Sequence, residues 1–191
     1  MKRFLQAGSL AGVIILAAMG APRAETATYG VSPGMTQGEA LAALKGVADC
    51  RVDKQGLDEG LLPSGTYLLS TRCVLRDGHG TLALRTTSSL SGDRIVEIEH
   101  GFRSSDRAEA AAEKLARAHG VAAARAEHVG GEWLWRLSDH VDLTLFVYPG
   151  GDARASVLRD TALQQQDLLV RNAHSTAFAP GALGERAGRG G

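Results

Sequence analysis

Cysteine is scarce in this chain, which has only Cys50 and Cys73 among its 191 residues. The two do not form a CxxC motif, so the usual dithiol redox site is excluded, and two cysteines without a nearby histidine do not make a zinc site. In an oxidising compartment a lone pair of cysteines usually forms a disulfide. We therefore expect Cys50 and Cys73 to be joined, and we expect no metal site.

The chain also lacks an excess of charge and the glycine motifs of nucleotide-binding proteins. Its 21 basic and 21 acidic side chains give a formal net charge of zero, and the basic residues form no stripe. Neither GxGxxG nor GxxxxGK[ST] occurs, although there are 24 glycines. Nucleic acid is therefore not an expected partner, and neither a phosphate-binding loop nor a cofactor is expected.

Long apolar runs are missing except near the start of the chain. A positive start at Lys2 and Arg3 is followed by an apolar core, Leu10–Met19, and then by small residues at which a signal peptidase could cut. This order is typical of a cleavable signal peptide, which we expect to be residues 1–24. The alternative is an uncleaved membrane anchor.

Removal of residues 1–24 would leave three more acidic than basic side chains. No cysteine lies near the end of the apolar core, so a lipid anchor would have no attachment atom, and no later segment is long or apolar enough to cross a membrane. We expect a periplasmic protein, with secretion to the medium as the alternative, and no integral membrane segment after cleavage of the signal peptide.

The first half of the remaining chain has the pattern of one helix and three strands. Thr36 and Glu39 have the spacing of a capping box, and the apolar residues after them recur at helical intervals. A segment rich in Gly, Asp and Pro, 51–65, predicts a loop. Alternating apolar residues between glycine-containing turns then predict three strands, at 66–75, 82–90 and 94–100.

The second half repeats this order of elements but not the residues themselves. Asp106 and Glu109 again have N-cap and N3 spacing, and Gly120 predicts the end of that helix. Three strands are expected at 132–137, 141–147 and 153–159. The segment 121–129 has no clear assignment, 160–173 fits either a helix or a continued strand, and 174–191 is expected to be a disordered tail.

Together these elements predict an α+β protein of two tandem modules, 25–103 and 104–173. Each module would be one helix followed by a three-stranded antiparallel sheet. Short turns between the strands favour antiparallel pairing, and each helix would cover one face of its sheet.

One part of the first half resembles a known family. The residues are Pro33-Gly34-Met35-Thr36, then Ala40-Leu41, then Gly92-Asp93-Arg94 before the last strand. This order is similar to the BamE (SmpA/OmlA) family of outer-membrane assembly proteins, and two such modules in tandem resemble the β-lactamase-inhibitory proteins. The resemblance implies a module that binds other proteins and performs no catalysis.

Residues with catalytic or metal-binding chemistry do not form a convincing group. Ser138, Asp139 and His140 are consecutive, and consecutive residues point in different directions, so they cannot converge as a triad without help from the fold. Glu97 and Glu99 share a strand face, which most often means a face in contact with water. We expect no catalytic residue and no enzyme activity.

The candidate binding residues lie on the two strands of the second half. Trp133 and Trp135 share one face, where they either pack in the core or bind a partner. Phe146 and Tyr148 point to the other face, alongside Arg136. Aromatic residues beside arginine are typical of protein-binding hot spots, although a second sheet or the C-terminal segment could cover them instead.

The resulting hypothesis is an exported periplasmic module that binds another envelope or secreted protein, either as an envelope scaffold or as an inhibitor of a partner enzyme. Recognition would use a rigid sheet face without covalent chemistry. The alternative is a periplasmic protein that binds a small ligand or an envelope polymer.

Overall fold

A computed structural model describes residues 26–57, 61–129, 131–148 and 153–175. The predicted signal peptide lies outside these ranges, and so does nearly all of the predicted tail. Within the described ranges, none of the helices has both the length and the apolar character needed to cross a membrane.

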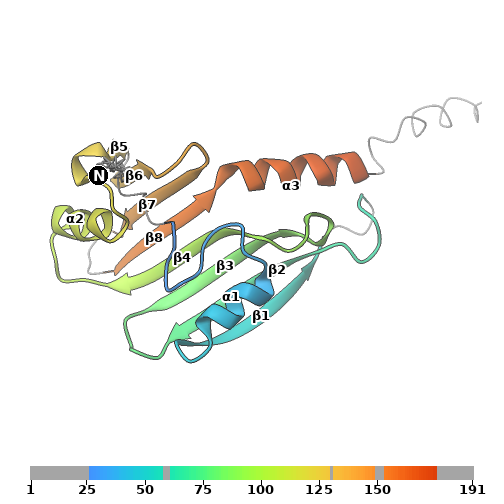
Figure 1. Ribbon diagram of the computed structural model, residues 1–191, viewed down its shortest axis with the longest axis horizontal. Coiled ribbons are helices and arrows are strands. Elements are labelled where there is room, and N and C mark those ends of the chain that lie inside the picture. The colour runs from blue at the N-terminus through green and yellow to red at the C-terminus, as the bar shows by residue number, and fades with distance from the viewer. Residues whose placement is uncertain (1–25, 58–60, 130, 149–152, 176–191) are drawn as a thin grey trace, which may run out of the picture.

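Eight strands form one antiparallel sheet, which Figure 1 shows from the side of the first helix. Their order across the sheet is β1-β2-β3-β4-β8-β7-β6-β5, so the two halves of the chain meet between β4 and β8. The strands are β1 (Ala48–Gly56), β2 (Tyr67–Leu75), β3 (Thr81–Ser88), β4 (Ile95–Arg103), β5 (Glu127–Val129), β6 (Glu132–Arg136), β7 (Val141–Val147) and β8 (Ala153–Asp160).

The prediction of two tandem modules, each a helix with three strands, is wrong. Each half contributes four strands, and the last strands of the two halves are hydrogen-bonded neighbours, with Ile98 opposite Leu158 and Glu99 opposite Val157. Both strands have buried residues on both faces, including Glu97 and Val157. The backbone N–H and C=O groups along both edges of a buried strand need hydrogen-bond partners. β4 and β8 supply such partners to each other and so make one continuous sheet.

The predicted loop at 51–65 is also wrong in its first part, which belongs to β1. This strand forms one edge of the sheet, and most of its side chains face water. Residues such as Arg51, Asp53 and Lys54 suit an exposed edge because charge discourages pairing with another chain, but they also remove the alternation that identifies a strand.

The sheet has two different faces. We call the inner face the one that carries Leu84, Ile98 and Leu158, and the outer face the one that carries Arg85, Glu97 and Arg159. Two helices, α1 (Gln37–Leu44) and α2 (Ala108–Ala118), contribute to the core on the inner face. The fully buried residues there include Leu44, Leu75, Leu82, Leu84, Ile95, Ile98, Trp135, Leu143, Leu145 and Leu158.

Local capping explains where the inner-face helices begin. The predicted capping box of α1 is confirmed, because the Thr36 side chain accepts a hydrogen bond from the Glu39 amide and the Glu39 carboxylate accepts one from the Thr36 amide. The predicted cap of α2 is not found. The N-cap is Arg107, which makes no side-chain cap, and Asp106 instead pairs with Lys114.

A third helix, α3 (Thr161–His174), follows β8 directly, and Figure 1 shows it continuing past the end of that strand. Asp160 is its N-cap and accepts a hydrogen bond from the Leu163 amide, which resolves the ambiguous segment as a helix. The buried Asp167 carboxylate accepts hydrogen bonds from the amide and the hydroxyl of Ser88, at the end of β3. These contacts fix the helix to the main sheet.

The expectation that Glu97 faces water is also wrong. The residue is 8% exposed, and its carboxylate contacts Arg159 at 2.6 Å and Arg85 at 3.4 Å. All three line a small cavity together with Asp167 and Arg171 of α3. The negative charge of Glu97 is therefore balanced by two arginines beside α3, a segment that the sequence left open between helix and strand.

The predicted disulfide between Cys50 and Cys73 is confirmed. The two residues stand directly opposite each other on β1 and β2, with their Cα atoms 4.0 Å apart. The bond therefore ties the edge strand β1 to the rest of the sheet.

Replacement of both cysteines by alanine should lower the free energy of unfolding by about 3 kcal/mol, because the bond closes a loop of some two dozen residues. Chemical denaturation of the wild type and the double variant measures this difference. Reduced wild-type protein is the control and should behave as the double variant does. Equal stability with and without the bond would contradict the prediction.

Candidate functional site

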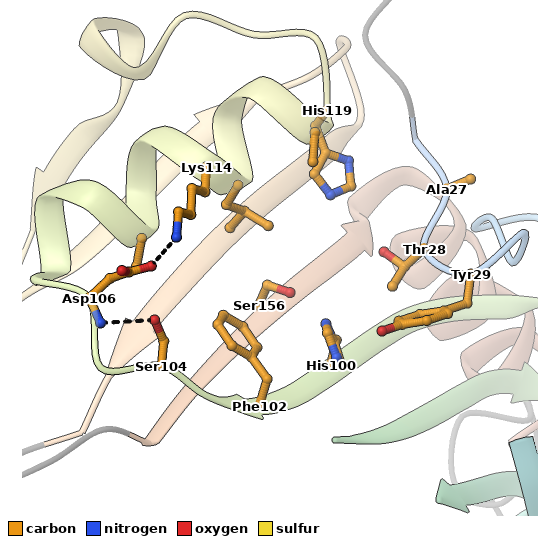
Figure 2. A pocket seen from close by; sticks show the side chains of 13 residues that line it. Ala27, Thr28, Tyr29, His100, Phe102, Ser104, Asp106, Lys114, His119 and Ser156 are labelled. Atoms are coloured by element: carbon orange, nitrogen blue, oxygen red, sulfur yellow. Dashed lines mark hydrogen bonds and ion pairs between the residues drawn. The ribbon is translucent and has the colours of Figure 1, made fainter. Parts of the chain in front are cut away.

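A pocket of about 360 Å³ lies on the inner face, between the sheet, α2 and the first described residues of the chain (Figure 2). Three separate segments form its walls: the ends of β4 and β8, one side of α2, and residues 27–29. Its lining residues are Ala27, Thr28, Tyr29, His100, Phe102, Ser104, Asp106, Ala111, Lys114, Leu115, Ala118, His119 and Ser156.

The sheet side of the pocket comes from alternate positions of two paired strands. His100 and Phe102 follow Ile98 at intervals of two, so they share the inner face. Their rings are stacked, with centroids 5.0 Å apart. Ser156 stands opposite His100 in the register of β4 and β8, and Figure 2 shows its side chain in the same open space.

A tight turn in front of α1 supplies the wall at Tyr29. Thr28 and Val31 exchange two backbone hydrogen bonds around Tyr29 and Gly30, both of which have positive φ. This is the pattern of a two-residue hairpin turn in which glycine is favoured. The buried Val31 anchors the turn, and the Tyr29 ring lies edge-on to His100, with centroids 5.2 Å apart.

The helix side of the pocket is lined mainly by small or aliphatic residues of α2. Ala111, Leu115 and Ala118 follow helical spacing, so they point to the same side. His119, the C-cap of this helix, is buried, and Figure 2 shows its ring above the pocket. Alanine at two of these positions leaves space that larger side chains would fill.

One end of the pocket is closed by an ion pair. The Lys114 ammonium is 2.5 Å from the Asp106 carboxylate, and Ser104 accepts a hydrogen bond from the Asp106 amide. The hydrogen bond from Lys114 holds the pKa of the Asp106 carboxyl below its usual value. The two opposite charges therefore satisfy each other at the rim.

The environment of His100 favours its neutral form. Burial lowers the pKa of this imidazole below its ordinary 6.5, although a hydrogen bond with the His79 backbone and the negative charge of Asp77 act in the opposite direction. The neighbouring turn approaches closely at Gly80, where a Cβ atom would lie 2.1 Å from the Gly101 carbonyl oxygen. Only glycine fits there, and it brings the turn that holds His79 against β4.

The pocket holds the residue types of a catalytic triad, but not the arrangement. None of the hydrogen bonds described joins Ser156 to His100, and the Asp106 carboxylate is bound to Lys114 and not to an imidazole. Nucleophilic catalysis needs a serine, a base and an orienting acid in one hydrogen-bonded chain. His140, the other histidine considered, lies 3.9 Å from Asp160, outside this pocket.

Metal binding has no support in the described ranges, where no group of three or more His, Cys, Asp or Glu side chains is placed to hold an ion. The chemistry that the pocket can offer is therefore apolar contact with a few hydrogen bonds.

The two tryptophans that were predicted as candidate binding residues lie on the inner face. Trp135 is 1% exposed and belongs to the core, next to Leu143 of β7. Trp133 is half-buried, and its ring lies 4.7 Å from that of His128 on β5. The burial of Trp135 agrees with the interpretation that it packs in the core. Neither tryptophan lines the pocket.

The other three predicted binding residues lie away from the pocket. Arg136 is exposed and pairs with Asp142, while Phe146 is half-buried and Tyr148 is 49% exposed. Arg136 and Phe146 both project to the outer face, as expected from strand alternation, but the prediction that they lie side by side is wrong, because Arg136 pairs with Asp142, four residues before Phe146. Arg154 of β8 lies on the opposite face, where it is buried and donates a hydrogen bond to the Asp106 carbonyl.

Sequence reasoning missed the pocket because its parts are far apart in the chain. His100 and Phe102 did carry a signal, since they continue the apolar alternation of β4 beyond Ile98. Tyr29-Gly30 before the buried Val31 was a second signal, as a turn pair next to an apolar residue. No sequence pattern indicated that α2 would leave a gap above these residues.

The depressed pKa of His100 predicts a pH dependence of stability. The unfolded chain takes up a proton below about pH 6.5 and the folded chain does not, so the free energy of unfolding should fall as the pH decreases from 6.5 towards about 5. The His100→Gln variant should lose less stability over this interval. Denaturation at several pH values measures both slopes, with His174→Gln at an exposed position as the control. Equal slopes for wild type and His100→Gln would contradict the assignment.

No family model, curated protein or solved structure gives a significant match to this chain. The resemblance to BamE proteins therefore depends on a short motif, and the function has to be argued from the pocket and the sheet faces.

Proposed function

We propose that this chain is an exported binding protein without catalytic activity, and that it holds a small ligand in the pocket between the inner face and α2. The observation that carries the proposal is the pocket itself. Its volume of about 360 Å³ lies within the range of small-molecule sites, and its walls are largely apolar with a few polar groups.

Binding accounts for the arrangement better than catalysis. Ser156 and His100 come from two paired strands and face one space, where each can form a hydrogen bond with a guest molecule. Catalysis would need them to be bonded to one another in sequence, and the carboxylate at the rim is already occupied by Lys114.

Export is supported by two independent features. The first residues have the order of a signal peptide, with positive charge, an apolar core and small residues. The disulfide between Cys50 and Cys73 is of the kind that persists in oxidising compartments. Both features support a periplasmic or secreted location.

The pocket can be filled from the rim without disturbing the core. Ala118 lines the pocket and is exposed, so Ala118→Leu should occupy the space and weaken ligand binding about tenfold or more. Ala110→Leu places the same side chain on the same helix outside the pocket and should bind as the wild type does. NMR titration with a panel of aromatic, aliphatic and saccharide probes measures binding.

Two results would contradict this proposal. One is that no probe in the panel binds at the pocket, as judged from the amide signals of Ser156 and His119. The other is hydrolysis of an ester probe by the wild type that is lost in Ser156→Ala, which would make the pocket an active site.

A second candidate function is recognition of another envelope or secreted protein, as a scaffold or an inhibitor. The observation that favours it is that Arg136, Phe146 and Tyr148 lie along β6 and the end of β7, with Arg136 and Phe146 on the outer face and Tyr148 49% exposed. Tyrosine and arginine are among the residues that most often dominate binding energy at protein interfaces.

This candidate is tested by charge and side-chain changes at exposed positions. Arg136→Glu and Tyr148→Ala should each reduce recovery of the main co-purifying protein from an envelope extract about tenfold or more. Arg72→Glu makes the same charge change on the same face near the opposite edge, and it should have no effect. Unchanged recovery with Arg136→Glu and Tyr148→Ala would remove this face as a binding site.

A further inference from the structure

We infer that the pocket selects an uncharged planar aromatic ligand that carries a hydroxyl-like hydrogen-bonding group. The inference rests on the proposed ligand-binding function and concerns the same site. Three features carry it: the rings on one side of the pocket, the aliphatic residues on the other side, and the charges at its rim.

The first feature is a row of three rings. Tyr29 lies edge-on to His100, with an angle of 81° between the ring planes, and His100 is stacked on Phe102 at 29°. Aromatic rings attract other aromatic rings at centroid distances of about 4.5–7 Å, in both edge-on and offset arrangements. A flat aromatic guest can therefore extend this row.

The second feature is the opposite wall. Ala111, Leu115 and Ala118 offer only apolar contact, and the two alanines make this side shallow. The space between this wall and the rings thus suits a guest that is apolar on both faces. Burial of both faces of such a ring removes apolar area from water on each side, which stabilises the complex.

The third feature is the absence of an available counter-charge among the described lining residues. Lys114 is bound to Asp106, and the backbone carbonyl of Asp106 accepts a hydrogen bond from the buried Arg154. An anionic guest would compete with Asp106 for Lys114, and a cationic guest would compete with Lys114 for Asp106. Lys114 and Asp106 lie at the rim, with side chains 67% and 32% exposed, and the described lining includes no other Lys, Arg, Asp or Glu. A charge carried deeper into the pocket would be buried without a counter-charge, so a neutral guest is favoured.

The polar atoms on the pocket wall define the group that the guest carries. Figure 2 shows the Ser156 side chain and the His100 ring at the same open space, and the buried Nε2 atom of His100 has no hydrogen-bond partner among the described residues. Burial lowers the pKa of His100, which keeps this second polar group uncharged near neutral pH. A hydroxyl on the guest can both donate and accept at these positions.

Three indole compounds of similar size separate the effect of charge from that of shape. Tryptophol is neutral, indole-3-acetate is an anion and tryptamine is a cation. Titration of the wild-type protein should give the highest affinity for tryptophol, with each charged compound at least about tenfold weaker. 2-Cyclohexylethanol, which keeps the hydroxyl and lacks the aromatic ring, should also bind more weakly than tryptophol.

Two variants connect the selectivity to this pocket. Ala118→Leu should abolish tryptophol binding while Ala110→Leu keeps it, and Ser156→Ala should weaken tryptophol about three- to tenfold by removing one hydrogen bond. Thermal unfolding of each variant in the absence of ligand checks that it is folded.

The outcomes distinguish this inference from the proposed function. If a charged indole or 2-cyclohexylethanol binds as tightly as tryptophol, and Ala118→Leu abolishes that binding, the pocket is a ligand site and the inferred ligand class is wrong. If none of these compounds and no probe of the wider panel binds, the proposed function fails and the inference fails with it.

Discussion

The pairing of β4 with β8 is the interaction on which the rest of the structure depends. It joins two four-stranded meanders into one sheet and makes the inner face continuous, so that α1 and α2 cover a single core. It also sets His100 opposite Ser156, which makes the floor of the pocket a property of both halves of the chain. Neither half could form that floor alone.

The pocket exists because α2 carries small side chains where it faces the sheet. Ala111 is buried and Ala118 is exposed, so the space begins beside the core and opens to solvent at the rim. Ala111 and Ala118 leave the space, and the stacked rings of His100 and Phe102 keep the sheet side from closing it. The same residues that form the cavity also define its chemistry.

Patterns within single segments were enough to predict several elements, among them the capped start of α1 at Thr36, the strand β7 and the disulfide. Alternation identifies the face on which a residue lies but not which strand lies next to it, so the β4–β8 neighbours and the single sheet could not be predicted. The edge strand β1 was missed because its charged residues resemble a loop. The candidate site needed three distant segments, and the predicted aromatic residues of β6 and β7 lie outside it.

The position of the disulfide makes the two edges of the sheet unequal. At one edge, β1 is held to β2 by a covalent bond and by a ladder that spans nine residues. At the other edge, β5 has only three residues, and its connection to β6 is entirely non-covalent. Local opening begins where the fewest contacts must break, so amide hydrogen exchange should be faster at β5 than at β1. β5 belongs to the same half of the chain as α2, and α2 forms one wall of the pocket. The edge that opens more easily is therefore in the half of the chain that supplies this wall.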